Sequence, residues 1–146
     1  MTRVDFYVLS DNNPVDQFTC AVAEKVRRQG LNIHIHTESR QTAARLDELL
    51  WTHHDISFLP HCLVDTEDSD EAPITIGWTG SDVTTGEVLI NLCTNVPNFA
   101  ASFARIIEIV GGQDPHREQA RGRYRQYREL GFDLHSHELE SRHAYT

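Results

Sequence analysis

The first 36 residues follow a strand, helix, strand pattern, which restricts the fold more than any other feature of this chain. Residues 3–9 (RVDFYVL) and 31–36 (LNIHIH) alternate in hydrophobicity as strands do. Between them, four apolar residues recur at helical spacing: Val15, Phe18, Val22 and Val26. Gly30 then stands where helices commonly end. Two strands joined by a helix favour a parallel sheet, so the pattern predicts an α/β fold.

The rest of the chain continues the alternation of helices and strands. A second helix is predicted over residues 39–50, with Ser39 or Thr37 as its N-cap. Further strands are predicted over residues 73–78, 87–92 and 106–110, and a last helix over residues 114–130. We therefore expect a mostly parallel sheet flanked by helices on both faces.

The length of 146 residues predicts a single domain. We place this domain at residues 1–134 and expect residues 135–146 to form a polar C-terminal tail. His135, His137 and His143 in that tail indicate fraying rather than regular structure.

Neither the amino terminus nor the hydropathy indicates export or membrane insertion. Residues 1–11 lack the apolar block of an export signal, and no apolar run approaches the roughly 20 residues that cross a bilayer. Cys20, Cys62 and Cys93 are odd in number and widely separated, which fits reduced buried thiols better than disulfides. We expect a soluble cytoplasmic protein without membrane contacts.

A basic helix stands out from an acidic chain. Residues 114–130 carry five Arg and three acidic residues, a net charge of +2, whereas the other residues sum to −11. Arg117, Arg121, Tyr124 and Arg128 follow at helical spacing, so three guanidinium groups and one ring share a face. Guanidinium groups bind carboxylates with two parallel hydrogen bonds. The stripe predicts an anion-binding surface; a merely solvated helix face is the alternative.

Few residues point to a catalytic or metal centre. The chain has neither a Walker loop nor a GxSxG nucleophile motif. His34 and His36 project from one face of a predicted strand, but no second motif supplies the further ligands that zinc needs. We expect no catalysis, no cofactor and no metal, with a small α/β nucleotide- or metal-binding enzyme as the alternative.

Direct nucleic-acid binding by the basic helix is a third hypothesis. The net charge of −9 argues against it, because affinity for a phosphate backbone comes from many Lys and Arg residues.

A second apolar feature surrounds a predicted loop: Trp51, Phe58, Leu59 and Pro60. Large side chains in a loop are harder to bury than those in regular elements, and aromatic residues are enriched at the centres of interfaces. Either these side chains contact a partner protein or they cap the core beneath the loop.

Six stretches of the chain, in this order and spacing, resemble one protein family. They are VDFYVL (residues 4–9), RLDELLW (45–51), SFLPH (57–61), VLINL (88–92), NFAASF (98–103) and ARGRYRQYRELGF (120–132). Together they resemble the chi subunit of bacterial DNA polymerase III, a part of the clamp-loader assembly. The resemblance implies a Rossmann-like fold and a noncatalytic adaptor in DNA replication.

The resemblance also implies two protein partners, with DNA contacted only indirectly. One partner is the acidic C-terminal tail of single-stranded-DNA-binding protein (SSB). By motif position, we expect Arg121 to hold the terminal carboxylate of this tail, Tyr124 and Val110 to surround its final Phe, and Arg117 to meet its acidic residues. Arg125 and Arg128 extend the same basic surface.

The second implied partner is the psi subunit. The residues that match the psi-contacting region are Trp51, Phe58, Pro60 and His61. Two departures from the family pattern lie in the basic helix. Arg117 replaces a familiar Lys and keeps its charge, and Gly122 replaces a larger polar residue, which weakens the helix by up to ~1 kcal/mol relative to Ala.

Overall fold

A seven-stranded parallel sheet forms the centre of the molecule, in the strand order β3-β4-β2-β5-β6-β1-β7. The structure is a computed structural model that describes residues 2–10, 14–52, 61–63, 73–78, 86–112 and 114–138. The strands are β1 (Arg3–Val8), β2 (Ile33–His36), β3 (His61–Leu63), β4 (Ile74–Gly77), β5 (Gly86–Asn91), β6 (Phe103–Val110) and β7 (Asp133–Glu138). The helices are α1 (Val15–Arg28), α2 (Arg40–Thr52), α3 (Asp114–Glu129) and the short 3₁₀ helix η1 (Ala100–Ser102).

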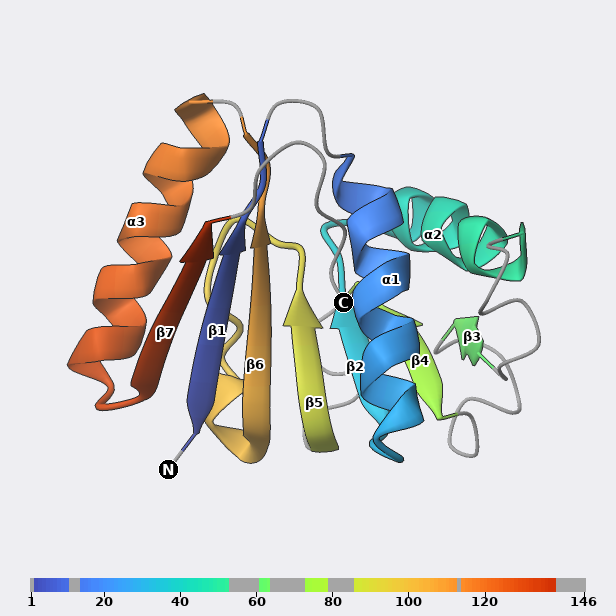
Figure 1. The fold of residues 1–146 in the computed structure, drawn as a ribbon, viewed down its shortest axis with the longest axis horizontal. Coiled ribbons are helices and arrows are strands. Elements are labelled where there is room, and N and C mark those ends of the chain that lie inside the picture. Colours follow the sequence, from blue (N-terminus) through green and yellow to red (C-terminus); the bar gives the residue numbers. More distant parts are fainter. Residues whose placement is uncertain are drawn as a thin grey trace.

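Helices cover both faces of the sheet, which confirms the predicted Rossmann-like α/β architecture. α1 and α2 pack against one face and share a hydrophobic cluster with β2, β4 and β5. α3 and η1 pack against the other face and share a second cluster with β1 and β6. Figure 1 shows α3 next to β7 at one end of the sheet, while α1 and α2 lie toward the end that holds β4 and β3.

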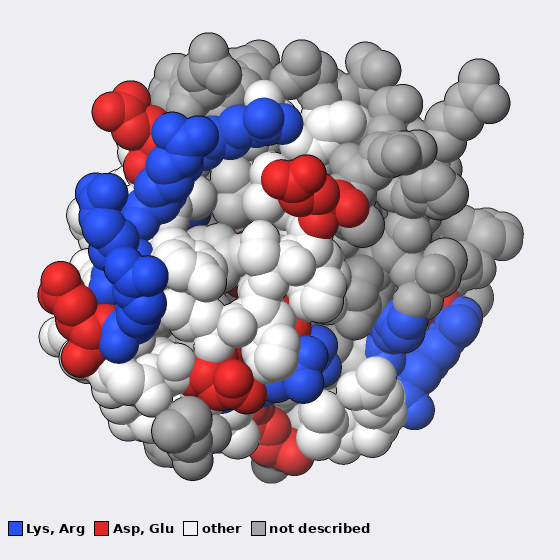
Figure 2. All heavy atoms as spheres, turned by 60° about the vertical axis from the view of Figure 1, so that its left-hand side comes forward, with Lys and Arg blue, Asp and Glu red and all other residues white. Residues whose placement is uncertain are grey.

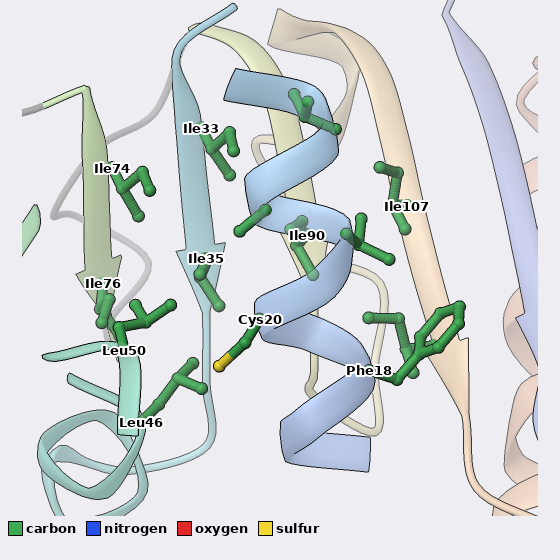
Figure 3. Close-up of a cluster of buried hydrophobic side chains, with 14 of the residues drawn as sticks. Phe18, Cys20, Ile33, Ile35, Leu46, Leu50, Ile74, Ile76, Ile90 and Ile107 are labelled. Atoms are coloured by element: carbon green, nitrogen blue, oxygen red, sulfur yellow. The ribbon is translucent and has the colours of Figure 1, made fainter. Parts of the chain in front are cut away.

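α1 forms where the helical spacing of apolar residues predicts it. Phe18, Val22 and Val26 are buried against the sheet, and Cys20 lies among isoleucines of the strands (Figure 3). Burial raises the pKa of the Cys20 thiol to about 12, so it is a protonated core residue at neutral pH. Gly30 ends the helix with a φ of +81°, a left-handed conformation that glycine adopts without strain.

The start of α2 confirms one of the two predicted N-caps. The backbone N–H of Thr42 donates to the Ser39 hydroxyl oxygen at 3.2 Å, which satisfies one of the unpaired donors in the first turn. α2 then buries Leu46 and Leu50 in the cluster beneath α1 (Figure 3).

Residues 106–110 belong to β6, the strand that their β-branched side chains predict. β6 pairs in parallel with β1 and β5, so it is buried on both faces and its central residues need no polar alternation. Gly111 follows β6 and lies close to the side chain of His116 in α3. A Cβ added at Gly111 would lie 2.6 Å from Nδ1 of His116.

One segment differs from the sequence-based prediction. Residues 135–138 belong to strand β7, not to a polar tail. β7 pairs in parallel with β1 as an edge strand, and one of its polar side chains, His137, hydrogen-bonds to Asp5.

Within the described residues, no helix is long and apolar enough to span a bilayer.

Candidate functional site

A cavity of about 180 Å³ lies between α3 and the carboxyl ends of β1, β6 and β7. Its lining residues are Phe6, Val8, Val110, Arg117, Ala120, Arg121, Tyr124, Ser136 and Glu138. We call it the α3 pocket. Four of the residues that the family resemblance assigns to one binding site line this cavity: Val110, Arg117, Arg121 and Tyr124.

The floor of the α3 pocket is apolar because its residues come from adjacent strands on the same face of the sheet. Val8 of β1 and Val110 of β6 are register partners, and Phe6 lies two residues earlier on β1. The ring of Tyr124 packs on Phe6, with 5.4 Å between the ring centroids. An aromatic or aliphatic side chain that enters this floor would leave water and contact rings and branched carbons.

Helix geometry places the charged wall of the pocket. Ala120 and Tyr127 of α3 are buried against the sheet. Arg117 and Arg121 lie one turn apart on the flank of α3 that faces the cavity, and both are exposed. Among the described residues, neither guanidinium forms an ion pair. Both groups are therefore free to bind an anion at the pocket mouth.

Arg125 and Arg128 are exposed on α3 but do not line the cavity. They continue the basic row away from it. Figure 2 shows blue side chains in a row beside a largely uncharged, hollowed area of the surface. An anionic ligand that fills the pocket can extend along this row.

The remaining members of the basic helix, Arg123 and Tyr127, point into the molecule. Arg123 is 7% exposed and its Nε donates to Oε1 of Glu108 at 2.9 Å. The hydroxyl of Tyr127 donates to Oε2 of Glu108 at 2.6 Å, and Asn91 donates to the same oxygen at 2.8 Å. Arg123, which is not among the four arginines expected to bind the tail, is thus held inside by its ion pair with Glu108.

Burial raises the pKa of Glu108, and the charge of Arg123 and the hydrogen bonds from Asn91 and Tyr127 offset part of that rise. Arg123 also donates to the carbonyl oxygen of Thr94 at 3.2 Å. These contacts join α3 to β6 and to the segment after β5. They set the rotation of the helix that presents the pocket wall.

A second polar cluster lies on the opposite face of the sheet. The side chain of Asp5 is fully buried and accepts hydrogen bonds from Arg3, Arg105 and His137, at 3.1, 3.1 and 3.0 Å. Burial by itself raises the pKa of Asp5, but the bonds from Arg3 and His137 and the charge of Arg105 lower it by more, so the pKa lies below its usual value. The cluster is internally paired and serves to fix β7 onto β1.

The strand histidines of the metal alternative are buried. His34 and His36 lie beneath the η1 region, where His36 contacts the ring of Phe99 at 5.1 Å between centroids. Nδ1 of His34 bonds to the Thr75 hydroxyl at 2.8 Å. Within the described ranges, no three His, Cys, Asp or Glu residues gather in a geometry that could hold a metal ion.

The second predicted surface is described only in part. Trp51 is 52% exposed near the end of α2. Phe58 and Pro60 lie outside the described residues. His61 begins β3, and its side chain is not described.

Five lining residues of the α3 pocket were not predicted from the sequence: Phe6, Val8, Ala120, Ser136 and Glu138. Of these, Glu138 carries a charge; it stands on β7, across from the arginines, in a segment that the sequence assigns to a tail. Residues 133–138 contain one apolar residue, Leu134, so no clear hydrophobic alternation identifies the strand from the sequence.

Comparison with solved structures supports the fold alone. The C-terminal domain of S. cerevisiae Dbp5, in a complex with Gle1 and IP6, matches with a TM-score of 0.63 at 11% identity, over 96% of this chain and 92% of that domain. In a longer Dbp5 chain the match has a TM-score of 0.62 and covers 42% of that protein's length. At an identity this low, the match shows a shared α/β architecture and nothing about function.

Comparison with sequences is more specific. The family described as DNA polymerase III chi subunit, HolC, matches residues 1–135. The DNA polymerase III subunit chi of Pseudomonas aeruginosa is 37% identical over 141 residues, covering 95% of this chain and 98% of the relative. The Escherichia coli subunit chi is 33% identical, covering 93% and 97%. By these matches the chain belongs to the DNA polymerase III chi subunit family, a family of noncatalytic accessory subunits in DNA replication.

Proposed function

We propose that the α3 pocket binds the acidic C-terminal tail of SSB and that the chain thereby connects SSB to the clamp-loader complex in the cytoplasm. The observation that carries this proposal is one cavity with an apolar floor, lined by two exposed guanidinium groups that form no ion pair with any residue in the described part of the chain. A peptide that ends in an aromatic residue and a free carboxylate matches both parts.

The roles of the lining residues in this proposal are those that the family resemblance implies. Arg121 holds the terminal carboxylate, and Val110 and Tyr124 surround the final Phe side chain. Arg117 meets the acidic residues that precede it, and Arg125 and Arg128 continue the basic row. The size supports one ring, because an apolar cavity of about 150 Å³ in another protein holds benzene.

The charge distribution supports an acidic partner. The chain as a whole carries −9, so an acidic peptide is repelled from most of its surface and attracted to the basic row. A contact of this size has an affinity on the order of micromolar, about −8 kcal/mol. Several tails on a multimeric partner would raise the overall affinity without a new contact.

Titration of a labelled acidic peptide that ends in Phe tests the proposal. We expect Arg121→Ala to weaken binding by roughly tenfold, because the charge-assisted hydrogen bonds between this guanidinium group and the terminal carboxylate of the peptide are lost. Arg28→Ala is the matched control, since Arg28 is an exposed arginine of α1 that pairs with Glu24 on the other face of the sheet. Equal affinities of the wild type and Arg121→Ala would remove Arg121 from the site.

We propose a separate surface for the psi subunit, formed by Trp51 with Phe58, Pro60 and His61. The exposure of Trp51 near the end of α2 supports it. Trp51→Ala should reduce copurification with psi while leaving the affinity for the tail peptide unchanged. Retention of psi by this variant at wild-type level would contradict the assignment of Trp51.

A further inference from the structure

The α3 pocket has two walls of opposite charge. Arg117 and Arg121 stand on α3, whereas Ser136 and Glu138 stand on β7 across the apolar floor. Among the described residues, Glu138 forms no ion pair, so its carboxylate does not neutralise either arginine. The family match ends at residue 135, so this wall lies beyond it.

Strand pairing fixes the place of Glu138. Ser136 is the register partner of Phe6, and Glu138 is the partner of Val8. Because side chains alternate along a strand, residues 136 and 138 share the pocket face with Phe6 and Val8.

The other face of β7 is anchored by His137. Its Nε2 lies 3.0 Å from Oδ1 of Asp5, and its ring stacks on Tyr7 with 4.8 Å between centroids. These contacts of His137 hold β7 in register on β1, so the backbone of Glu138 stays beside the cavity.

We infer that Glu138 determines specificity by excluding carboxylates from the β7 side of the pocket. This inference rests on the proposed function of the pocket. A bound acidic peptide must place its negative side chains along α3, where Arg117 and the rest of the basic row lie. The part of the peptide that passes β7 must be uncharged or offer N–H donors to Glu138 and Ser136. The pocket thus selects the direction of the peptide as well as its charge.

Removal of this negative charge strengthens the binding of an acidic ligand. Two like charges within several ångströms at a solvent-accessible site change an affinity by roughly three- to tenfold. Glu138→Gln keeps the shape and the acceptor oxygen of the side chain. Glu87→Gln is the charge-matched control, because Glu87 is an exposed residue at the start of β5, away from α3, that does not line the cavity.

The test is a titration of two peptides that share a terminal Phe and free carboxylate. One peptide has acidic residues before the Phe, and in the other these residues are replaced by their amides. We expect Glu138→Gln to bind the acidic peptide roughly three- to tenfold more tightly than the wild type, with a smaller gain for the amide peptide. Glu87→Gln should match the wild type for both peptides.

Two results would overturn the inference in distinguishable ways. If the wild type binds the acidic peptide and Glu138→Gln binds it no more tightly, the pocket keeps its proposed function and Glu138 loses its role. If the wild type binds neither peptide, the proposed function fails and the inference fails with it. Equal gains from Glu138→Gln and Glu87→Gln would show an effect of net charge only, which also contradicts the inference.

Discussion

Glu108 of β6 and Arg123 of α3 form a buried ion pair, with 2.9 Å between Oε1 and Nε. The helix that carries the exposed arginines is thus attached to the sheet by an arginine of its own. Since Arg121 and Arg123 are two residues apart on a helix, they point in different directions, and fixing one inward holds the other at the flank. The ion pair therefore connects the core of the protein to the geometry of the α3 pocket.

Truncation of Arg123 should destabilise the protein strongly. Arg123→Ala leaves the Glu108 carboxylate buried without its counter-charge, and we expect a loss of about 3 kcal/mol in the free energy of unfolding. Arg125→Ala, an exposed neighbour on the same helix, should change stability by less than about 0.5 kcal/mol. Urea denaturation of both variants measures the difference. Similar losses in the two variants would contradict the structural role of Arg123.

Gly122→Ala should stabilise the protein. Gly122 lies within α3, has no positive φ, and an added Cβ would meet nothing within 4 Å. Alanine in a helix interior is more stable than glycine by roughly 0.5–1 kcal/mol, mainly because the unfolded chain loses freedom. Thermal unfolding should show a raised Tm, with the affinity for the tail peptide unchanged. A lowered Tm would show that α3 needs the glycine for a reason other than space.

The buried cluster of Asp5 with Arg3, Arg105 and His137 should make the free energy of unfolding depend on pH. The pKa of Asp5 is lowered in the folded protein, so its contribution is present above the unfolded pKa of about 3.9 and is lost as the pH falls through the folded value. Asp5→Asn lacks this contribution at any pH. We expect the stability gap between wild type and Asp5→Asn to be wide at pH 7 and to shrink below about pH 4.

Denaturant unfolding of both proteins between pH 7 and pH 2.5 checks this prediction. A gap that stays constant over this range would show that the Asp5 carboxylate is not stabilised by its partners, Arg3, Arg105 and His137.

Much of the fold could be predicted because local patterns and long-range packing agree. α1 forms from four apolar residues at helical spacing, and Ser39 caps α2 with its hydroxyl. The β-branched residues of β6 predict a buried strand, and Gly131 ends α3 with a φ of +82°. Each of these elements is specified by residues within a few positions of one another.

The differences arise where distant contacts decide. Arg121 and Arg123 are the same residue type, two positions apart. Arg123 is the one that is buried because it pairs with Glu108, which lies 15 positions away in the sequence. β7 consists largely of polar residues, so its hydrophobic pattern is weak, and its pairing with β1 is set by residues more than a hundred positions apart. The place of Glu138 in the pocket follows from that pairing. The sequence thus indicates the arginine wall but not the wall opposite it.

The central claim is that a guanidinium group recognises a free terminal carboxylate beside an apolar floor. Its most direct measurement is isothermal titration of the wild type with one acidic Phe-terminated peptide in two forms, free acid and C-terminal amide. We predict that the amide binds at least about tenfold more weakly than the free acid to the wild type. The two forms should differ little in their affinity for Arg121→Ala, because this variant lacks the guanidinium group that binds the terminal carboxylate. Equal affinity of the two forms for the wild type would contradict the account.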